Sequence, residues 1–223
     1  MCSSDLDRAS PTQPVRPIFA EALGMTDDRS PYVYLSDGGH FDNLGLYAMV
    51  LRRCRVIVVS DASTDPDYQY QSLAQAIRQI KMDLGVPIEM GPMSFGNNLE
   101  ARTSRRNRYC AMGIIRYSAV DKPVNTDPDP DYDGVLIYIK PSLNGSEPRD
   151  VLSYRDETNG FPQDAAGDEG FSDPQFESYR RLGSHMIETI CTGGVGAANP
   201  FENFENQARA HVDARARSDV QRG

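Results

Sequence analysis

Two apolar runs that both end in Ser-Asp constrain the fold of this chain more than any other feature. They lie within YVYLSDGGHFDNLGLYAMVLRRCRVIVVSDAS, which covers residues 32–63. The first run, 32–36, is rich in β-branched and aromatic residues and is bounded by Pro31 and a glycine pair, which predicts a strand. An apolar helix and a second strand follow within about thirty residues, as in a βαβ unit. The pattern predicts a sheet whose strands carry aspartates at their carboxyl ends.

The helix of this unit is predicted at residues 43–53. Asn43 stands where an N-cap residue is preferred, and Arg52 and Arg53 fall in the last turn, where the helix dipole favours cations. The continuous apolar run RVIVVSD then begins at Arg55. Such a run is typical of a parallel strand that is covered on both faces.

The rest of the chain continues the alternation of helices and strands. A helix is predicted over 70–84, ending at Gly85, because apolar residues recur there at helical spacing. The other predicted elements are a short helix at 18–24, strands at 86–90, 109–118 and 134–141, loops at 95–108 and 144–174, and a helix at 175–191. This order predicts a three-layer α/β fold with a mainly parallel sheet.

Composition excludes several classes of function. The net charge is −9 and no stripe of Arg and Lys with interleaved aromatics occurs, which argues against nucleic acid as a partner. The four cysteines are far apart in the sequence, which is typical of reduced thiols in a cytoplasmic protein. No apolar run approaches the roughly 20 residues of a membrane span, and the first residues contain no secretory signal. We therefore expect a cytoplasmic protein.

Asp37 and Asp61 both follow predicted strands, where functional groups collect in α/β sheets. Gly38 and Gly39 after Asp37 permit positive φ and close approach of a substrate. From this local pattern alone, a catalytic carboxylate and a turn aspartate bonded to its own backbone both stay open. For Asp61 we favour a structural role, in which the carboxylate caps the next element or binds loop amides.

Metal sites are not expected. His40, Asp42 and Asp37 are not accompanied by a second pair at metal-ligand spacing. The acidic stretch DPDPDYDG at 127–134 matches the start of a calcium loop, but Lys140 stands where a bidentate glutamate is needed. A solvated acidic loop is the better interpretation, and no cofactor is predicted.

No serine nucleophile of the usual kind is present. A serine hydrolase needs the G-x-S-x-G turn that exposes its serine, and no serine in this chain has glycines two residues away on both sides. Cys54 and Cys110 have apolar neighbours, which indicates structural cysteines rather than reactive thiols. A nucleophile that acts with Asp37 would therefore lie outside this chain.

The stretch LSDGGHFDNLGLYAMVLRRCRVIVVSDAS resembles the C-terminal catalytic half of bacterial patatin-like phospholipases, which are related to cytosolic phospholipases A. AIRQIKMDLGVPIEM, YCAMGIIRYS, GVLIYIKPSLNGSEPRDVLSYRDETNGFP and DPQFESYRRLG match in the same order. The resemblance covers about residues 18–190. It implies a three-layer α/β-hydrolase-like fold and a Ser-Asp dyad that acts on acyl esters of lipids, without a cofactor. The family's D-G-G aspartate corresponds to Asp37, whereas its G-x-S-x-G serine and its oxyanion loop are absent.

The resemblance implies that the chain is a fragment of a lipid acyl-ester hydrolase, with a fold that is incomplete at the N-terminal side. We expect a disordered start at 1–17, the C-terminal part of the catalytic domain at 18–196, and a polar, partly helical tail at 197–223. Asp37 would be the catalytic residue, and Gly38, Gly39 and Asn43 would support its turn. The substrate would be a lipid or phospholipid, with transient contact to a membrane surface through the missing part.

Two other functions stay open. The chain is alternatively a non-catalytic remnant that acts as an interaction or regulatory domain, which the missing nucleophile favours. A calcium or carbohydrate binding module is supported by the acidic loops alone.

Overall fold

The computed structural model describes residues 13, 15–27, 29–30, 32, 38–97, 99, 107–121, 132–164, 170–191 and 200–220. The chain divides into two compact units, Met1–Phe41 and Asp42–Gly223. The first unit contains helix α1 (Arg16–Ala22), where a short helix was predicted, and the 3₁₀ helix η1 (Gly38–His40). Residues 33–37, which include most of the predicted first strand and Asp37, lie outside the described residues.

The second unit is built on a mixed sheet of four described strands in the order β1-β4-β3-β2. These strands are β1 (Val56–Ser60), β2 (Ile88–Met90), β3 (Cys110–Ile115) and β4 (Gly134–Ile139). β1 runs parallel to β4, whereas β3 is antiparallel to both β4 and β2. The prediction of a mainly parallel sheet is therefore wrong for the described strands. No crossover helix separates β2, β3 and β4 in the described chain, and strands joined in this way pair antiparallel.

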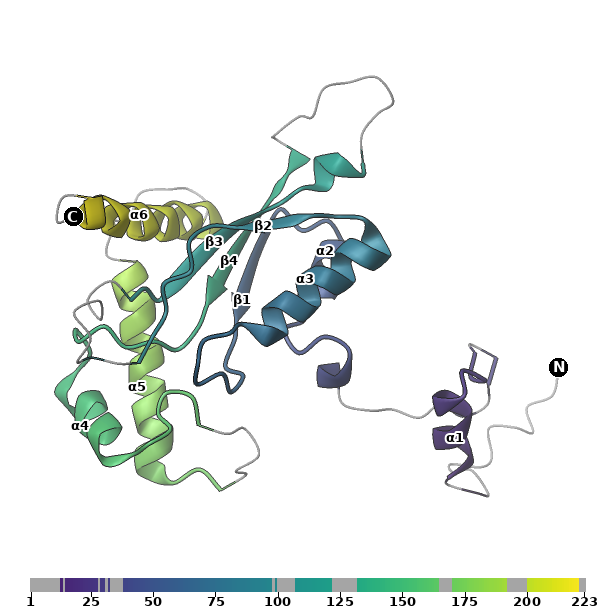
Figure 1. Cartoon of the computed structure of the whole chain (residues 1–223), viewed down its shortest axis with the longest axis horizontal. Helices are drawn as coiled ribbons and strands as arrows, with labels where there is room; N and C mark the ends of the chain where they lie inside the picture. The colour runs from purple at the N-terminus through teal and green to yellow at the C-terminus, as the bar shows by residue number, and fades with distance from the viewer. Residues whose placement is uncertain are drawn as a thin grey trace. The chain divides into compact units, whose positions relative to one another are not determined.

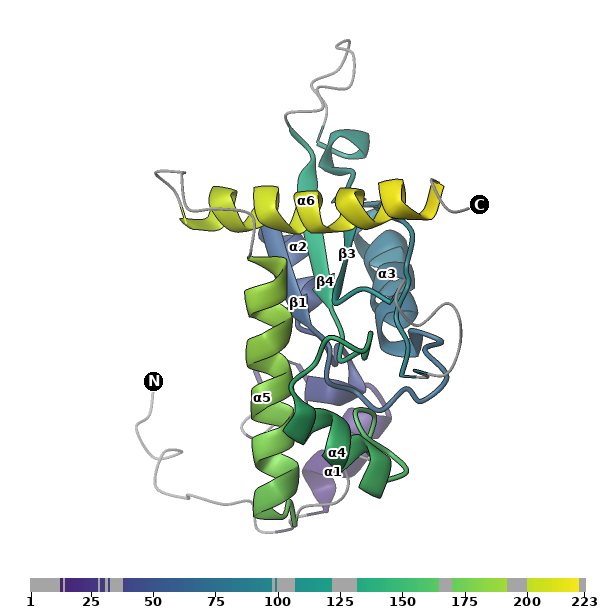
Figure 2. The same cartoon turned by 90° about the vertical axis from the view of Figure 1, so that its left-hand side faces the viewer.

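Helices lie on both faces of this sheet (Figures 1 and 2). α2 (Leu46–Leu51) and α3 (Gln71–Leu84) share a core with one face, to which Ile57, Val59 and Tyr138 belong. α5 (Asp173–Ile190) and α6 (Pro200–Val220) share a second core with the other face, to which Ile137 and Ile139 belong. The α/β architecture predicted from the sequence is thus present, with the sheet between two layers of helices.

α3 forms where its sequence pattern predicted it. Leu73 and Ile80 on its apolar stripe are 2% and 0% exposed, and the helix ends at Gly85 in the left-handed conformation, with φ of 69°. β1 agrees with its prediction on one face only. Ile57 and Val59 are buried, whereas Val58 between them is 44% exposed. The face of Ile57 and Val59 is therefore fully buried among the described residues, whereas on the other face Val56 packs partly against the second core and Val58 is exposed.

α4 (Arg149–Glu157) lies inside a segment that was predicted as loop, which corrects that prediction. Its apolar pattern is weak, since Val151 is its single fully buried side chain. The helix is held by tertiary contacts with α5, which include an ion pair of 2.8 Å between Arg181 and Asp150. Short helices with little intrinsic stability depend on such packing, so a local pattern does not reveal them.

α6 occupies most of the segment predicted as a polar tail. Its Ala208 is fully buried in the second core, and the helix contacts β3 and α5. None of the described helices combines the length and apolarity that crossing a bilayer requires.

Candidate functional site

The turn after Asp37 differs from the sequence prediction in its backbone. Gly38 belongs to η1 and does not adopt the left-handed conformation that the two glycines were expected to supply. A Cβ atom at Gly38 would meet none of the described residues within 4 Å. The positive φ of this stretch occurs instead at Gly45, with φ of 66°, at the start of α2. Asp37 itself lies outside the described residues.

The N-cap function assigned to Asn43 is performed by Asp42, which corrects the prediction. The Asp42 carboxylate accepts the backbone N–H groups of Leu44 at 3.2 Å and Tyr47 at 2.7 Å, whereas Gly45 occupies the formal cap position without a side-chain bond. A short loop separates the carboxylate from the helix, so the acceptor stands one residue earlier than the pattern suggested. Asp42 thereby fixes the loop that leads into α2.

We expect Asp42→Ala to lower the free energy of unfolding by about 1 kcal/mol, because two backbone N–H groups lose their acceptor. Asn43→Ala should change it by less than about 0.5 kcal/mol, as for an ordinary surface substitution. Urea unfolding followed by circular dichroism measures both. An equal loss for the two variants would contradict the assignment of the cap to Asp42.

Asp61 lies at the carboxyl end of β1 and is 1% exposed. Its Oδ1 accepts the backbone N–H of Ser63 at 2.9 Å and the Ser63 hydroxyl at 2.6 Å. Its Oδ2 accepts the Tyr138 hydroxyl and lies 3.3 Å from the Lys140 ammonium. The loop-amide bond is the structural role that the sequence predicted for Asp61.

These contacts keep Asp61 ionised. Burial would raise the pKa of its carboxyl, but hydrogen bonds from Ser63 and Tyr138 and the charge of Lys140 outweigh that effect and hold the pKa below its usual range. Burial and the hydrogen bond to Asp61 raise the pKa of Tyr138. A general base must reach the proton that it removes, whereas Asp61 is shielded from solvent and its oxygens are already occupied by donors. Its chemistry is therefore that of an anchor.

Lys140 is the functional side chain that sequence reasoning missed. It directly follows β4, is fully buried, and donates to the carbonyl of Ser63 at 3.0 Å. Its ammonium also lies 3.8 Å from Asp65, whose carboxylate accepts the N–H of Tyr70 at the start of α3. The available signal was that VIVVSD and GVLIYIK are apolar runs that end in opposite charges. Lys140 thus joins the ends of the parallel strands β1 and β4 to the loop that leads to α3.

A polar hollow of about 170 Å³ opens beside this loop. Ser63, Asp65 and Ser72 line it, whereas Asp61 does not. The Ser63 hydroxyl donates to Asp61, and the hydroxyl of Ser72 donates to Ser63 at 3.3 Å. Because its pKa is lowered, the Asp61 carboxylate is a weak proton acceptor. Ser63, whose hydroxyl donates to Asp61, is therefore not activated as a nucleophile.

A serine and a histidine meet in the loop after Lys140. The Ser146 hydroxyl lies 3.0 Å from Nε2 of His185 on α5 and donates to the side-chain oxygen of Asn144 at 2.7 Å. The buried carboxylate of Glu147 accepts hydrogen bonds from the Tyr109 hydroxyl and from the backbone N–H groups of Asn144 and Gly145. A nucleophilic serine must donate its hydrogen bond to the imidazole, whereas the Ser146 hydroxyl donates to the side-chain oxygen of Asn144. This network fixes the loop against α5.

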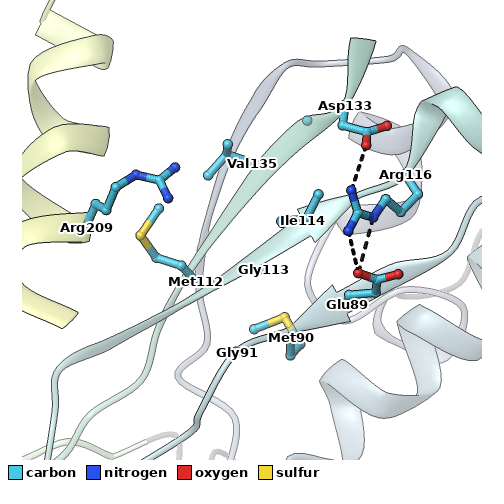
Figure 3. A pocket seen from close by; sticks show the side chains of 11 residues that line it. Glu89, Met90, Gly91, Met112, Gly113, Ile114, Arg116, Asp133, Val135 and Arg209 are labelled. Carbon is cyan, nitrogen blue, oxygen red and sulfur yellow. Dashed lines mark hydrogen bonds and ion pairs between the residues drawn. The ribbon is translucent and has the colours of Figure 1, made fainter. Parts of the chain in front are cut away.

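A larger hollow of about 470 Å³ lies over β2, β3 and β4 beside α6 (Figure 3). Its apolar lining consists of Met90, Met112, Ile114 and Val135, and Arg209 of α6 points toward Met112. On the other side, Arg116 bridges Glu89 at 2.8 Å and Asp133 at 3.0 Å. None of the described residues that line the hollow is a serine, cysteine or histidine.

Asp133 is the last acid of the stretch that matched a calcium loop. Its carboxylate is engaged by Arg116 and by the N–H of Ser118 at 3.0 Å. Burial would raise the pKa of Asp133, but these two partners hold it below its usual range. Residues 122–131, which hold the other acids of that stretch, lie outside the described residues.

Comparisons with known proteins give no assignment. No family model, curated protein or solved structure matches this chain.

Proposed function

We propose that this chain is the part of a lipid acyl-ester hydrolase that carries Asp37, the general base of a Ser-Asp pair. The single observation that carries the proposal is the ordered set of motifs that resembles patatin-like phospholipases, with Asp37-Gly38-Gly39 at the place of the catalytic aspartate. The substrate would be a lipid or phospholipid, met during transient contact with a membrane surface. The serine would come from a segment outside residues 1–223.

Two structural observations support this assignment. A Cβ atom at Gly38 would meet none of the described residues within 4 Å, which suits a turn that a substrate approaches closely. Asp61, the other strand-end aspartate, is buried and committed to Lys140, Tyr138 and Ser63. Of the two candidates, Asp61 is thus unsuited to act as a base, which leaves Asp37.

The proposal predicts that residues 1–223 alone hydrolyse no ester, since a base without a nucleophile cannot form an acyl-enzyme. Turnover of p-nitrophenyl butyrate by the pure chain should equal that of its Asp37→Ala variant. A protein extended upstream through a G-x-S-x-G serine should hydrolyse phospholipid vesicles. Turnover by residues 1–223 above the Asp37→Ala variant would contradict the assignment of the serine to another segment.

A non-catalytic interaction domain is the second candidate. It is favoured by large apolar side chains that are exposed in and after α1, among them Phe19 at 65%, Leu23 at 70% and Met25 at 71%. Large apolar side chains exposed within one short segment favour an interaction surface. A folded, extended protein that contains the serine and yet hydrolyses no lipid ester would favour this alternative over the hydrolase.

A further inference from the structure

The larger hollow has an apolar floor that neighbouring strands build together (Figure 3). Ile114 of β3 is the direct cross-strand partner of Val135 on β4 and of Glu89 on β2, so these side chains stand in one row on the same face of the sheet. Met112 precedes Ile114 by two residues and therefore shares this face, and Met90 of β2 lies beside it. Ile114 is 41% exposed, and the other apolar side chains of the floor are half-buried. The described residues thus leave a contiguous apolar surface accessible.

The two ends of the hollow differ in charge. At one end, Arg116 lies between the carboxylates of Glu89 at 2.8 Å and Asp133 at 3.0 Å, so negative charge is in excess there. At the other end, Arg209 of α6 points toward the floor (Figure 3). Its Nη2 pairs with Glu205, one turn earlier on α6, at 3.1 Å. Exposed pairs at this spacing contribute little stability, so the guanidinium can bind a second carboxylate.

These features select a ligand with one anionic end and a long apolar remainder. A peptide carries an amide at every residue, and an amide placed over this floor would lose its hydrogen bonds to water without replacement. The flexible, polarisable thioethers of Met90 and Met112 adapt to an alkyl chain. The planar guanidinium of Arg209 matches the two oxygens of a carboxylate. The volume of about 470 Å³ falls in the range of small-molecule sites, roughly 300–1,000 Å³.

We propose that the larger hollow is a fatty-acid site. The carboxylate binds Arg209, and the alkyl tail covers the apolar floor. The excess negative charge around Arg116 disfavours the reverse orientation. Hydrolysis of a lipid acyl ester releases a fatty acid, so the site would hold the product of the hydrolase proposed above, and that link alone rests on the proposed function.

Isothermal titration calorimetry of residues 1–223 with dodecanoate, below its micellar concentration, tests the proposal. Arg209→Gln should weaken binding by at least about tenfold, because charge-assisted hydrogen bonds are lost. Glu205→Gln should tighten binding, because it removes a competing carboxylate. Arg180→Gln is the matched control, since the Arg180 side chain is 54% exposed, against 55% for Arg209, and also pairs with an acid on its own helix. This control should bind dodecanoate as the wild type does.

Two further ligands separate the head group from the tail. Dodecanol keeps the tail without the carboxylate, butyrate keeps the carboxylate without the tail, and each should bind at least about tenfold more weakly than dodecanoate. Ile114→Gln, which makes the centre of the floor polar at an exposed position, should weaken binding while circular dichroism shows an unchanged fold. Asp37→Ala should bind as the wild type does, so failure of the hydrolase proposal and failure of this site give different results.

Methyl NMR of methionine-labelled protein locates the ligand, with signals assigned from Met90→Leu and Met112→Leu. The methyl signals of Met90 and Met112 should shift on titration, whereas that of Met82, which is 75% exposed on α3, should not. Equal shifts at Met82 would indicate surfactant-like adsorption and would overturn the proposal. Absence of dodecanoate binding would overturn it, as would binding by Arg209→Gln as tight as that of the wild type.

Discussion

Asp61→Asn is expected to lower the free energy of unfolding by about 3–5 kcal/mol, because it leaves the buried Lys140 ammonium without its nearest anion. Lys140→Met should be nearly as costly, since Asp61 then keeps a buried charge without its cation. The double variant Asp61→Asn, Lys140→Met should lose less than the sum of the two single losses, because no unpaired charge remains. Denaturant unfolding of the three variants measures these losses.

Asp67→Asn is the matched control, because Asp67 lies in the same loop and is exposed. It should change stability by less than about 0.5 kcal/mol. If Asp61→Asn were as mild as this control, the Lys140 pair would not be the anchor described above. In the proposed hydrolase, extended to include its serine, Asp61→Asn should keep activity within about tenfold at a temperature where the protein is folded, since Asp61 is too shielded to act as a base.

The carboxylate of Asp61 also makes the stability of the fold depend on pH. The pKa of Asp61 is lowered in the folded state, so the folded protein binds its proton less readily than the unfolded chain does. The stabilising contribution is fully present above the ordinary value of 3.8 and is lost as the pH falls toward the lowered value. Asp61→Asn should therefore show a smaller loss of stability than the wild type does between neutral pH and about pH 3.

Asp37→Asn, in a protein that contains the serine, is expected to lower kcat by at least about a hundredfold with the fold intact. The substitution keeps the shape of the side chain and removes its basicity, and general base catalysis typically contributes about 10²–10⁴-fold. Hydrolysis of phospholipid vesicles at saturating substrate measures kcat. Circular dichroism confirms that both proteins are folded.

Asp27→Asn is the control for this experiment. Asp27 is a turn aspartate that accepts the N–H of Arg29 at 3.1 Å and the Ser30 hydroxyl at 3.0 Å. If Asp37 were a turn aspartate of the same kind, the two variants would behave alike. Retention of more than roughly a tenth of the wild-type kcat by Asp37→Asn would remove it from the mechanism.

Periodicity and apolar runs predicted the elements that are stabilised by burial. The stripe through Leu73 and Ile80 fixed α3 to within a residue or two, and the runs before Asp61 and Lys140 became β1 and β4. These signals are local and strong, because each side chain on the stripe or run enters the core. Gly85 ended α3 as predicted for a different local reason, because few other residues adopt its φ without strain.

The predictions that failed depend on contacts between distant residues. The direction of β3 is set by its pairing with β2 and β4, and α4 is held by α5, so neither is encoded in a short window. Burial of Lys140 requires Asp61 from another strand, and a lysine after an apolar run is usually solvated. The Asp42 cap differed by one position because the loop before α2 contains a left-handed glycine.

The strand order also predicts a folding order. β3 and β4 are neighbours along the chain and pair antiparallel, whereas β1 must pair with β4 over a long stretch of sequence, Val56 with Val135. Pairings between distant segments form slowly, because the entropy of closing the loop is lost before the contact is gained. We therefore expect β1 to join the sheet late. Until it docks, its apolar VIVVS stretch is accessible to other chains during synthesis, so expression yield should depend on how fast this strand joins the sheet.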